Sequence, residues 1–509
     1  MTYRIDDLDA RHPPVDLTIS FLSPITPTST LRQSIPASYV TVHVVGAVDL
    51  SVYIDLNGQW VSGDWESLLR WDLDLLAVHR HGRPVNLKKW RVQRQTELLL
   101  SEIRDRAEWG TLHFTAPSVC LFPPVFFFSS VFPLALGRST RNPAHDRLTV
   151  TSPLQDVQHE SGPASRLRQR FARTGTLHNV IDRAARSIMD HEPVFAFSKR
   201  FHLSGGSAGA RIRSDSVTFT ISHIQNTVAQ FALEEEPKMM EPLWKSWFRN
   251  ANDLLAFHYT DLASARRLSD NYSAQLAVDA YESGADDYVD IVALSARQVL
   301  GATTFSGTPD QPILFMKEIS SNGNFQTIDV IFPSFPFFLY TNPRWLAYLL
   351  EPLIEHMLSG QYPNDYAMHD LGSHFPNATG HPNGDDEYMP VEECGNLLIM
   401  GLALVNSLHY SDSHSSLSRW AAEGEPSPEG HGETRGIFPL GQLQFRDGID
   451  RQDPKWGGSK QGDRQAKRWV TRSYRLWKQW TAYLVDFSLE PHNQRKYQTP
   501  FPVTIRANQ

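Results

Sequence analysis

The hydrophobic pattern of this chain changes its period near Pro242, and that change limits the folds available to it. Before Pro242, short apolar runs alternate with polar residues, as in 217–221, where Val, Phe and Ile are separated by threonines. A period of two is typical of β-strands with one buried face. After Pro242, apolar residues recur at helical spacing, for example in 276–282 and 288–300. Strands first and helices second predict separate domains rather than an interleaved α/β fold.

The length of 509 residues also favours more than one hydrophobic core. We predict an antiparallel β-sandwich over residues 1–238 and a helical domain over 239–509. An apolar insertion at about 117–150 interrupts the β pattern, and 411–462 is a long polar excursion between helices.

Two shorter segments carry local predictions of their own. The basic run 166–170 is predicted to be a solvated loop. The segment 332–338 is predicted to be extended because of its two prolines.

Composition narrows the classes of partner. The net charge of −8 argues against a nucleic-acid binder, whose binding face should be basic. Cys120 and Cys394 are too few for a disulfide framework or a cysteine-based zinc site. No signal peptide is recognisable in the first twenty residues, and the apolar run 119–137 is interpreted as a buried insertion rather than a membrane helix. We therefore expect a small-molecule substrate, no nucleic acid and no membrane, and we leave the oligomeric state open.

The stretch 364–402 contains the candidate catalytic residues. Its first part contains too many glycines and prolines for a regular element, so it is predicted to be a loop. Pro390 then suits the first position of a helix, and Glu392 and Glu393 suit its first turn, where carboxylates meet the positive end of the helix dipole. The candidate carboxylates of the loop and first turn are Asp370, Asp385, Asp386, Glu387, Glu392 and Glu393.

Two acids in different environments can hydrolyse an amide or a glycosidic bond. One stays protonated to assist the leaving group, and the other is ionised and activates water or attacks directly. A solvated loop followed by an acidic helix cap explains the same residues without any chemistry, and the residues alone do not decide between the two interpretations.

Other chemistries have weaker support. His369, His374 and His381, completed by Asp370 or Asp385, are the set that could hold a metal, but no metal-binding motif supports them. We therefore predict no metal and no cofactor. The glycine-rich run around Ser207 matches the nucleophile-elbow pattern only formally, because a strand rather than a helix is expected after it.

Several motifs together resemble the fungal glutaminase A family. Two lie in the stretch already described: Met368-His-Asp-Leu-Gly-Ser-His-Phe-Pro-Asn-Ala-Thr-Gly-His and Asp386-Glu-Tyr-Met-Pro-Val-Glu-Glu-Cys-Gly-Asn. Others are Phe21-Leu-Ser-Pro-Ile-Thr-Pro, Lys317-Glu-Ile-Ser-Ser-Asn-Gly-Asn and Val330-Ile-Phe-Pro-Ser-Phe-Pro. The match covers most of the chain outside roughly 117–150 and 411–462.

The resemblance implies an N-terminal β-sandwich packed on an (α/α)6 toroid of the six-hairpin glycosidase type. It also implies hydrolysis of L-glutamine to L-glutamate and ammonia by a secreted fungal enzyme. Within the matching motifs we predict catalytic roles for Asp370, Glu392 and Glu393, with Glu392 or Glu393 as base and Asp370 as acid or orienting group. The predicted substrate-binding residues are His369, His374, Asp385, Glu387 and Asn396.

The sequence departs from the family pattern after Pro491, where further helices are expected, so we predict an incomplete toroid. Two alternatives follow. One is a glycoside hydrolase that uses the same carboxylates on a sugar, since relatives of the toroid fold are mostly glycoside hydrolases. The other is an inactive fragment or a carbohydrate-binding remnant.

Overall fold

The fold is described from a computed structural model of the chain. The described residues are 1–5, 14–80, 83–118, 157–204, 212–233, 237–318, 322–409, 436–440 and 460–489. Most of the predicted insertion at 117–150, most of the excursion at 411–462, and Ser207 lie outside these residues.

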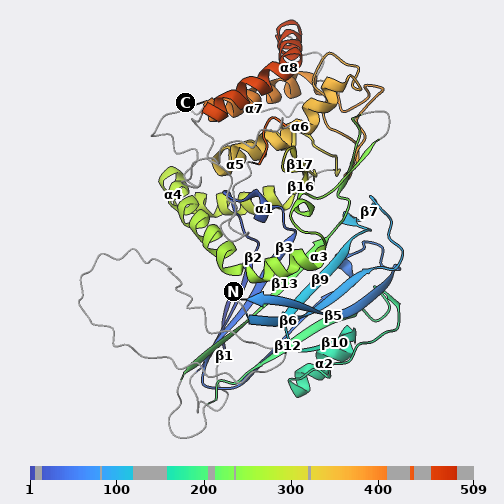
Figure 1. Ribbon diagram of the computed structural model, residues 1–509, viewed down its shortest axis with the longest axis vertical. Coiled ribbons are helices and arrows are strands. Elements are labelled where there is room, and N and C mark those ends of the chain that lie inside the picture. Colours follow the sequence, from blue (N-terminus) through green and yellow to red (C-terminus); the bar gives the residue numbers. More distant parts are fainter. Residues whose placement is uncertain are drawn as a thin grey trace, which may run out of the picture.

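Two antiparallel sheets form the first half of the chain (Figure 1). The larger sheet has the strand order β1-β2-β3-β13-β9-β6-β5-β11, and the smaller has the order β10-β12-β4. Their strands are β1 (Thr2–Ile5), β2 (Val15–Leu22), β3 (Ala37–Gly46), β4 (Leu50–Asn57), β5 (Leu68–Arg80), β6 (Arg83–Arg94), β9 (Thr111–Pro117), β10 (Gln158–Pro163), β11 (Arg186–Ser187), β12 (Pro193–Phe201) and β13 (Arg213–Ile224). A short hairpin, β7 (Glu102–Ile103) and β8 (Arg106–Ala107), projects from this half.

The sandwich core lies between the two sheets. Trp90 of β6 and Phe114 of β9 come from the larger sheet, and Phe197 of β12 comes from the smaller one. The Phe114 and Phe197 rings are 4.8 Å apart between centroids, within the range in which aromatic rings attract one another. In β13, Val217 and Phe219 are buried, as the alternation predicts, whereas Ile221 is half-buried and Thr220 is buried.

The basic run 166–170 lies in helix α2 (Ala164–Thr174), so the prediction of a loop is wrong. Leu167 buries against the small sheet, while Arg168 faces outward and pairs with Asp55 of β4 at 2.8 Å. Gly175 ends the helix at a φ of +66°, a conformation that glycine adopts without strain. One apolar face was enough to form a helix despite the basic residues around it.

The second half of the chain is helical, as predicted, with short strands that contribute residues to its core. Its helices are α3 (Ala251–Thr260), α4 (Leu262–Gly301), α5 (Ile328–Thr341), α6 (Pro343–Ser359), α7 (Pro390–His409) and α8 (Lys460–Phe487). Its strands are β14 (Ala229–Phe231), β15 (Lys238–Met240), β16 (Thr303–Gly307), β17 (Pro312–Met316) and β18 (Asn377–Ala378). Helix α4 is bent at Gly284, between the two helical segments that the sequence predicts.

Helix α5 contradicts the prediction that 332–338 is extended. Pro333 and Pro336 both lie inside it, each removing one N–H of the helical ladder. Ile328, Ile331 and Phe338 are fully buried in the core of the helical half. Their burial outweighs the cost of the two prolines, which a local reading of the sequence does not capture.

A segment of the first half inserts into the second. Helix α1 (Thr30–Gln33) carries Arg32, whose guanidinium pairs with Asp261 at 2.7 Å with both side chains almost fully buried. Thr30 accepts a hydrogen bond from Trp345 of α6 at 2.9 Å. The two halves are therefore joined by specific polar contacts, and in Figure 1 helices α5 to α8 stack above the sheets.

Candidate active site

The loop before α7 is held by backbone pairing with another segment. Phe325 donates its N–H to Gly372 O at 2.9 Å, and Leu371 donates to Phe325 O at 2.7 Å. Ile328, the first residue of α5, donates to His369 O at 2.9 Å. On its other side the loop forms β18, which pairs in parallel with β14. The loop is therefore part of the folded core of the helical half.

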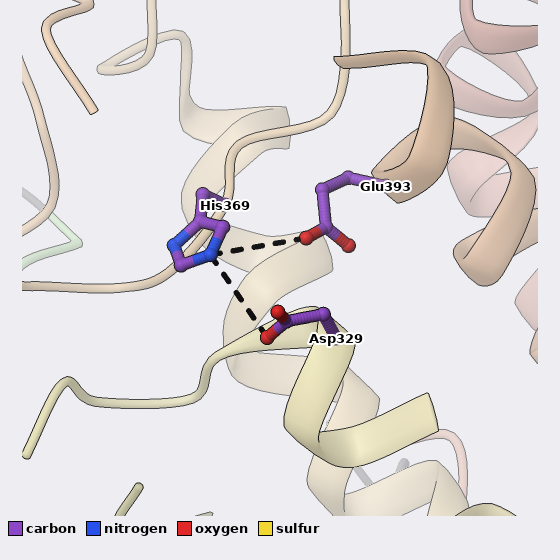
Figure 2. Close-up of side chains that lie close together, drawn as sticks. All are labelled: Asp329, His369 and Glu393. Carbon is purple, nitrogen blue, oxygen red and sulfur yellow. Dashed lines mark ion pairs between the residues drawn. The ribbon is translucent and has the colours of Figure 1, made fainter. Parts of the chain in front are cut away.

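This pairing brings together side chains from three elements. Asp329 lies in the first turn of α5, His369 lies in the loop, and Glu393 lies in the first turn of α7 (Figure 2). His369 Nε2 lies 3.9 Å from Asp329 Oδ1 and 4.0 Å from Glu393 Oε1. It is also 3.8 Å from Glu387 Oε2. We call Asp329, His369 and Glu393 the acidic–histidine cluster.

Asp370 fixes the orientation of His369. Its Oδ2 accepts from His369 Nδ1 at 2.8 Å, and its Oδ1 accepts from His381 Nε2 at 2.8 Å and from the Gly372 N–H at 2.7 Å. Burial alone would raise the pKa of Asp370, but the hydrogen bonds from the two histidines outweigh it and lower the pKa to about 2. Asp370 is therefore an ionised anchor that turns His369 Nε2 toward the cluster.

The charge of His369 depends on the surrounding carboxylates. Burial alone would lower the pKa of His369, but the hydrogen bond with Asp370 and the charge of Glu393, followed by the charges of Asp370 and Asp329, raise the pKa to about 9. His369 is then protonated at neutral pH, with Nε2–H directed into the cluster.

The pKa values of the carboxyl groups in and beside the cluster are shifted in the opposite direction to that of Asp370. Burial raises the pKa of Glu393 well above its usual value; the charge of His369 opposes this rise, and the charges of Asp329 and Glu392 add to it. Burial also raises the pKa of Glu392 and of Asp329. Acids that lie close together in one small space repel one another when ionised, so each of these carboxyl groups gives up its proton less readily than a free one.

Such a site can move protons. A buried carboxyl with a raised pKa donates a proton to a leaving group, and a neighbouring carboxylate accepts one from water. A fixed imidazolium N–H can also stabilise an oxygen that becomes negative during the reaction.

The sequence around this site matches a known protein family. Residues 285–422, which contain the whole cluster, match the model of the glutaminase A six helical-hairpin domain, and residues 8–279 match a domain of unknown function. The chain belongs to the glutaminase A family. The prediction of antiparallel β-sheets followed by a helical region of six-hairpin type is therefore confirmed.

Two curated relatives of this family have long alignments with the chain. It is 55% identical over 482 residues to a protein named probable glutaminase from Arthroderma benhamiae, covering 94% of this chain and 51% of the relative. It is 37% identical over 432 residues to glutaminase A from Aspergillus oryzae, covering 82% of this chain and 54% of the relative. The chain thus spans about half the length of the curated relatives it matches.

Within the glutaminase A motifs, the predicted site residues fall into two groups. Near the cluster lie His369, Asp370, Glu387, Glu392, Glu393 and Asn396. Asn396 donates to Glu393 Oε2 at 3.4 Å. Two predicted residues lie apart: His374 is exposed and its Nδ1 bonds to Phe375 O at 2.6 Å, and Asp385 is exposed on the loop.

The weaker metal hypothesis named a different set of residues. His381 contacts Asp370, and His374 faces solvent, so of the three histidines only His369 belongs to the acidic–histidine cluster. The structure instead groups His369 with Asp329 and Glu393.

Sequence reasoning missed Asp329. The signal was present, because Asp329 comes immediately before the family motif that begins at Val330 and suits the first turn of a helix. The prediction of an extended segment over 332–338 hid it, since a helix start was not expected there.

Helix α7 alone among the described helices has the length and hydropathy of a membrane-spanning helix, and half of that stretch is buried inside the protein. It packs against α5, α6 and α8. A buried helix of a helical core passes the same test of length and hydropathy.

Proposed function

We propose that this protein is a carboxylate-driven hydrolase of the glutaminase type, converting L-glutamine and water to L-glutamate and ammonia. The observation that carries the proposal is the contrast in carboxyl pKa around one imidazole. The pKa of Asp370 is lowered to about 2, while the pKa of Glu393, on the other side of His369, is raised well above its usual value. The names of both relatives support the choice of substrate.

In the proposed reaction a water molecule attacks the amide carbon of glutamine. Glu392 or Asp329 takes the proton of that water, and the carbonyl oxygen gains the negative charge. His369 Nε2–H stabilises this oxygen. Glu393 then gives its proton to the amide nitrogen, the C–N bond breaks, and ammonia leaves. Asp370 acts through His369 as a positioning residue rather than as the acid, because hydrogen bonds occupy both of its oxygens.

The test is ammonia release from L-glutamine by the full chain and by Glu393→Gln. The variant keeps the size of the side chain but cannot donate a carboxylic proton, so we expect a loss of about 100- to 10,000-fold in kcat. Asp385→Asn, on the exposed part of the same loop, is the control and should keep wild-type activity. Undiminished ammonia release by Glu393→Gln would overturn the assignment.

A parallel assay covers the alternative predictions. Sugar release from aryl glycosides without ammonia release from glutamine would favour the glycoside hydrolase. Turnover of neither substrate by a folded wild-type chain would favour the inactive remnant.

A further inference from the structure

The acidic–histidine cluster has the spacing of a metal site. One atom from each residue faces the same small space: Asp329 Oδ1, His369 Nε2 and Glu393 Oε1 (Figure 2). The potential ligand atoms all lie within 4.8 Å of one another. An ion in the plane of these three atoms and equidistant from them would lie about 2.2–2.5 Å from each, at or slightly beyond the roughly 2.0–2.2 Å of zinc bonds to imidazole nitrogen and carboxylate oxygen.

An independent observation points to a missing ligand. Glu393 is fully buried, and its Oε1, the atom aimed into the cluster, has no hydrogen-bond partner among the residues described. Asp329 Oδ1 is also buried and without a hydrogen-bond partner in the same part of the chain. A buried carboxylate oxygen left without a partner is costly, and a cation between these two would satisfy both.

The residues behind the cluster hold the three side chains in place. A histidine that binds a metal usually donates its other ring N–H to a carboxylate, which fixes the ring and its tautomer. His369 does this through the 2.8 Å bond from Nδ1 to Asp370 Oδ2. Glu393 is held through its other oxygen by Asn396. Neither contact uses an atom that faces the ion position.

A fourth carboxylate lies beside the cluster. Glu387 Oε2 lies 3.8 Å from His369 Nε2, and its side chain is 40% exposed. Zinc sites with three protein ligands keep a fourth position for a water molecule or a substrate atom, and structural sites fill it with a fourth side chain.

We propose that Asp329, His369 and Glu393 bind one divalent transition-metal cation of the Zn²⁺ or Mn²⁺ class. Imidazole together with carboxylates suits these ions, whereas Ca²⁺ and Mg²⁺ prefer ligand sets made of oxygen only. The proposed roles of Glu393 as a proton donor and of His369 Nε2–H as a hydrogen-bond donor both require a proton where the ion would bind. The metal-bound form and the proton-donating form therefore exclude each other, and this consequence rests on the proposed function.

The experiment measures binding directly. The purified full chain is dialysed against EDTA, titrated with ZnCl2 or MnCl2 by calorimetry, and its metal content is counted by mass spectrometry. We expect one ion per chain and weaker binding of CaCl2 and MgCl2. Asp329→Asn and Glu393→Gln should each bind at least tenfold more weakly, while Asp385→Asn and His374→Gln should match the wild type.

Two outcomes would overturn the site: no binding by the wild type, or binding that Asp329→Asn and Glu393→Gln leave unchanged. Thermal unfolding with and without metal guards against misfolded variants, since a variant that unfolds at the wild-type temperature without metal but gains nothing from metal has lost the site alone. An NH4Cl titration under the same conditions should give no comparable signal, and an equal one would show a general cation pocket instead of a metal site.

Activity in EDTA separates this proposal from the proposed function. Turnover that persists in EDTA and falls when Zn²⁺ is added is the expected result. Turnover that requires the ion would leave the site standing and overturn the proton-donor role of Glu393. Metal binding by a chain with no glutaminase turnover would support the site and count against the proposed function.

Discussion

Two buried glutamates in the helical half of this protein have opposite surroundings. Glu351 of α6 accepts hydrogen bonds from Trp469 Nε1 at 2.6 Å and from Arg472 Nη2 at 2.8 Å, and both of its oxygens have partners. Glu393 of α7 has one oxygen bonded to Asn396 at 3.4 Å and one with no hydrogen-bond partner among the described residues. Similar side chains are thus buried in two different ways.

The difference in hydrogen bonding distinguishes a structural carboxylate, Glu351, from a candidate catalytic one, Glu393. Around Glu351 opposite charges are in direct contact, so the carboxylate is satisfied and holds α6 to α8. In the acidic–histidine cluster His369 Nε2 lies 3.9–4.0 Å from the oxygens of Asp329 and Glu393, too far for direct hydrogen bonds and close enough for the groups to alter one another's pKa. A site that must accept a proton, a substrate atom or an ion cannot be filled by its own residues.

The largest expected effect on stability comes from Glu351→Ala. The substitution leaves Trp469 Nε1 and the Arg472 guanidinium without their acceptor and opens a cavity between α6 and α8. We expect a loss of about 3 kcal/mol in the free energy of unfolding, measured by urea denaturation. Exposed Asp385→Ala is the control. A loss no larger than that of the control would show that the Glu351 contacts do not hold the helices together.

A smaller effect is expected from the pH dependence of stability. The folded pKa of His369 is raised from 6.5 to about 9. Its contribution is fully present below pH 6.5 and is lost as the pH rises through 9, because the folded state holds the proton more tightly. In EDTA, the wild type should lose about 2 kcal/mol of unfolding free energy across this window, and His369→Gln should lose less. Parallel pH profiles for the two proteins would contradict the raised pKa.

The smallest effect is expected from Glu393→Gln. The substitution replaces an acid that lacks a full set of partners, so we expect the unfolding free energy to stay within about 1 kcal/mol of the wild type or to rise. Urea denaturation beside Glu351→Ala sharpens the comparison of the two glutamates. A loss as large as that of Glu351→Ala would mean that Glu393 is a structural residue.

The sequence predicted those parts of the site that depend on local rules. Pro390 and the two acids after it start α7 as expected, because proline and carboxylates both suit the first turn of a helix. The strand β13 was also predicted from a local pattern, the alternation of apolar and polar residues. These patterns act over a few residues and need no knowledge of the rest of the chain.

The features that the sequence did not predict depend on contacts between distant residues. Helix α5 forms around two prolines because its apolar residues reach a common core, and no local rule predicts that. Asp329 meets His369 only because the segments at 325–328 and 369–372 are paired. His374 and Asp385 looked equivalent to their neighbours in sequence, and only the path of the loop separates them from the cluster.

The pairing of Ile328 with His369 also means that the residues of the site come from two parts of the helical half. Asp329 and His369 lie on segments joined by a backbone hydrogen bond, while Glu393 is placed by α7. The distance from Glu393 to Asp329 and His369 therefore depends on how α7 packs on α5. Substitutions in that packing, far from any reacting atom, can widen or narrow the site, so its preferences can evolve while its chemical groups stay the same.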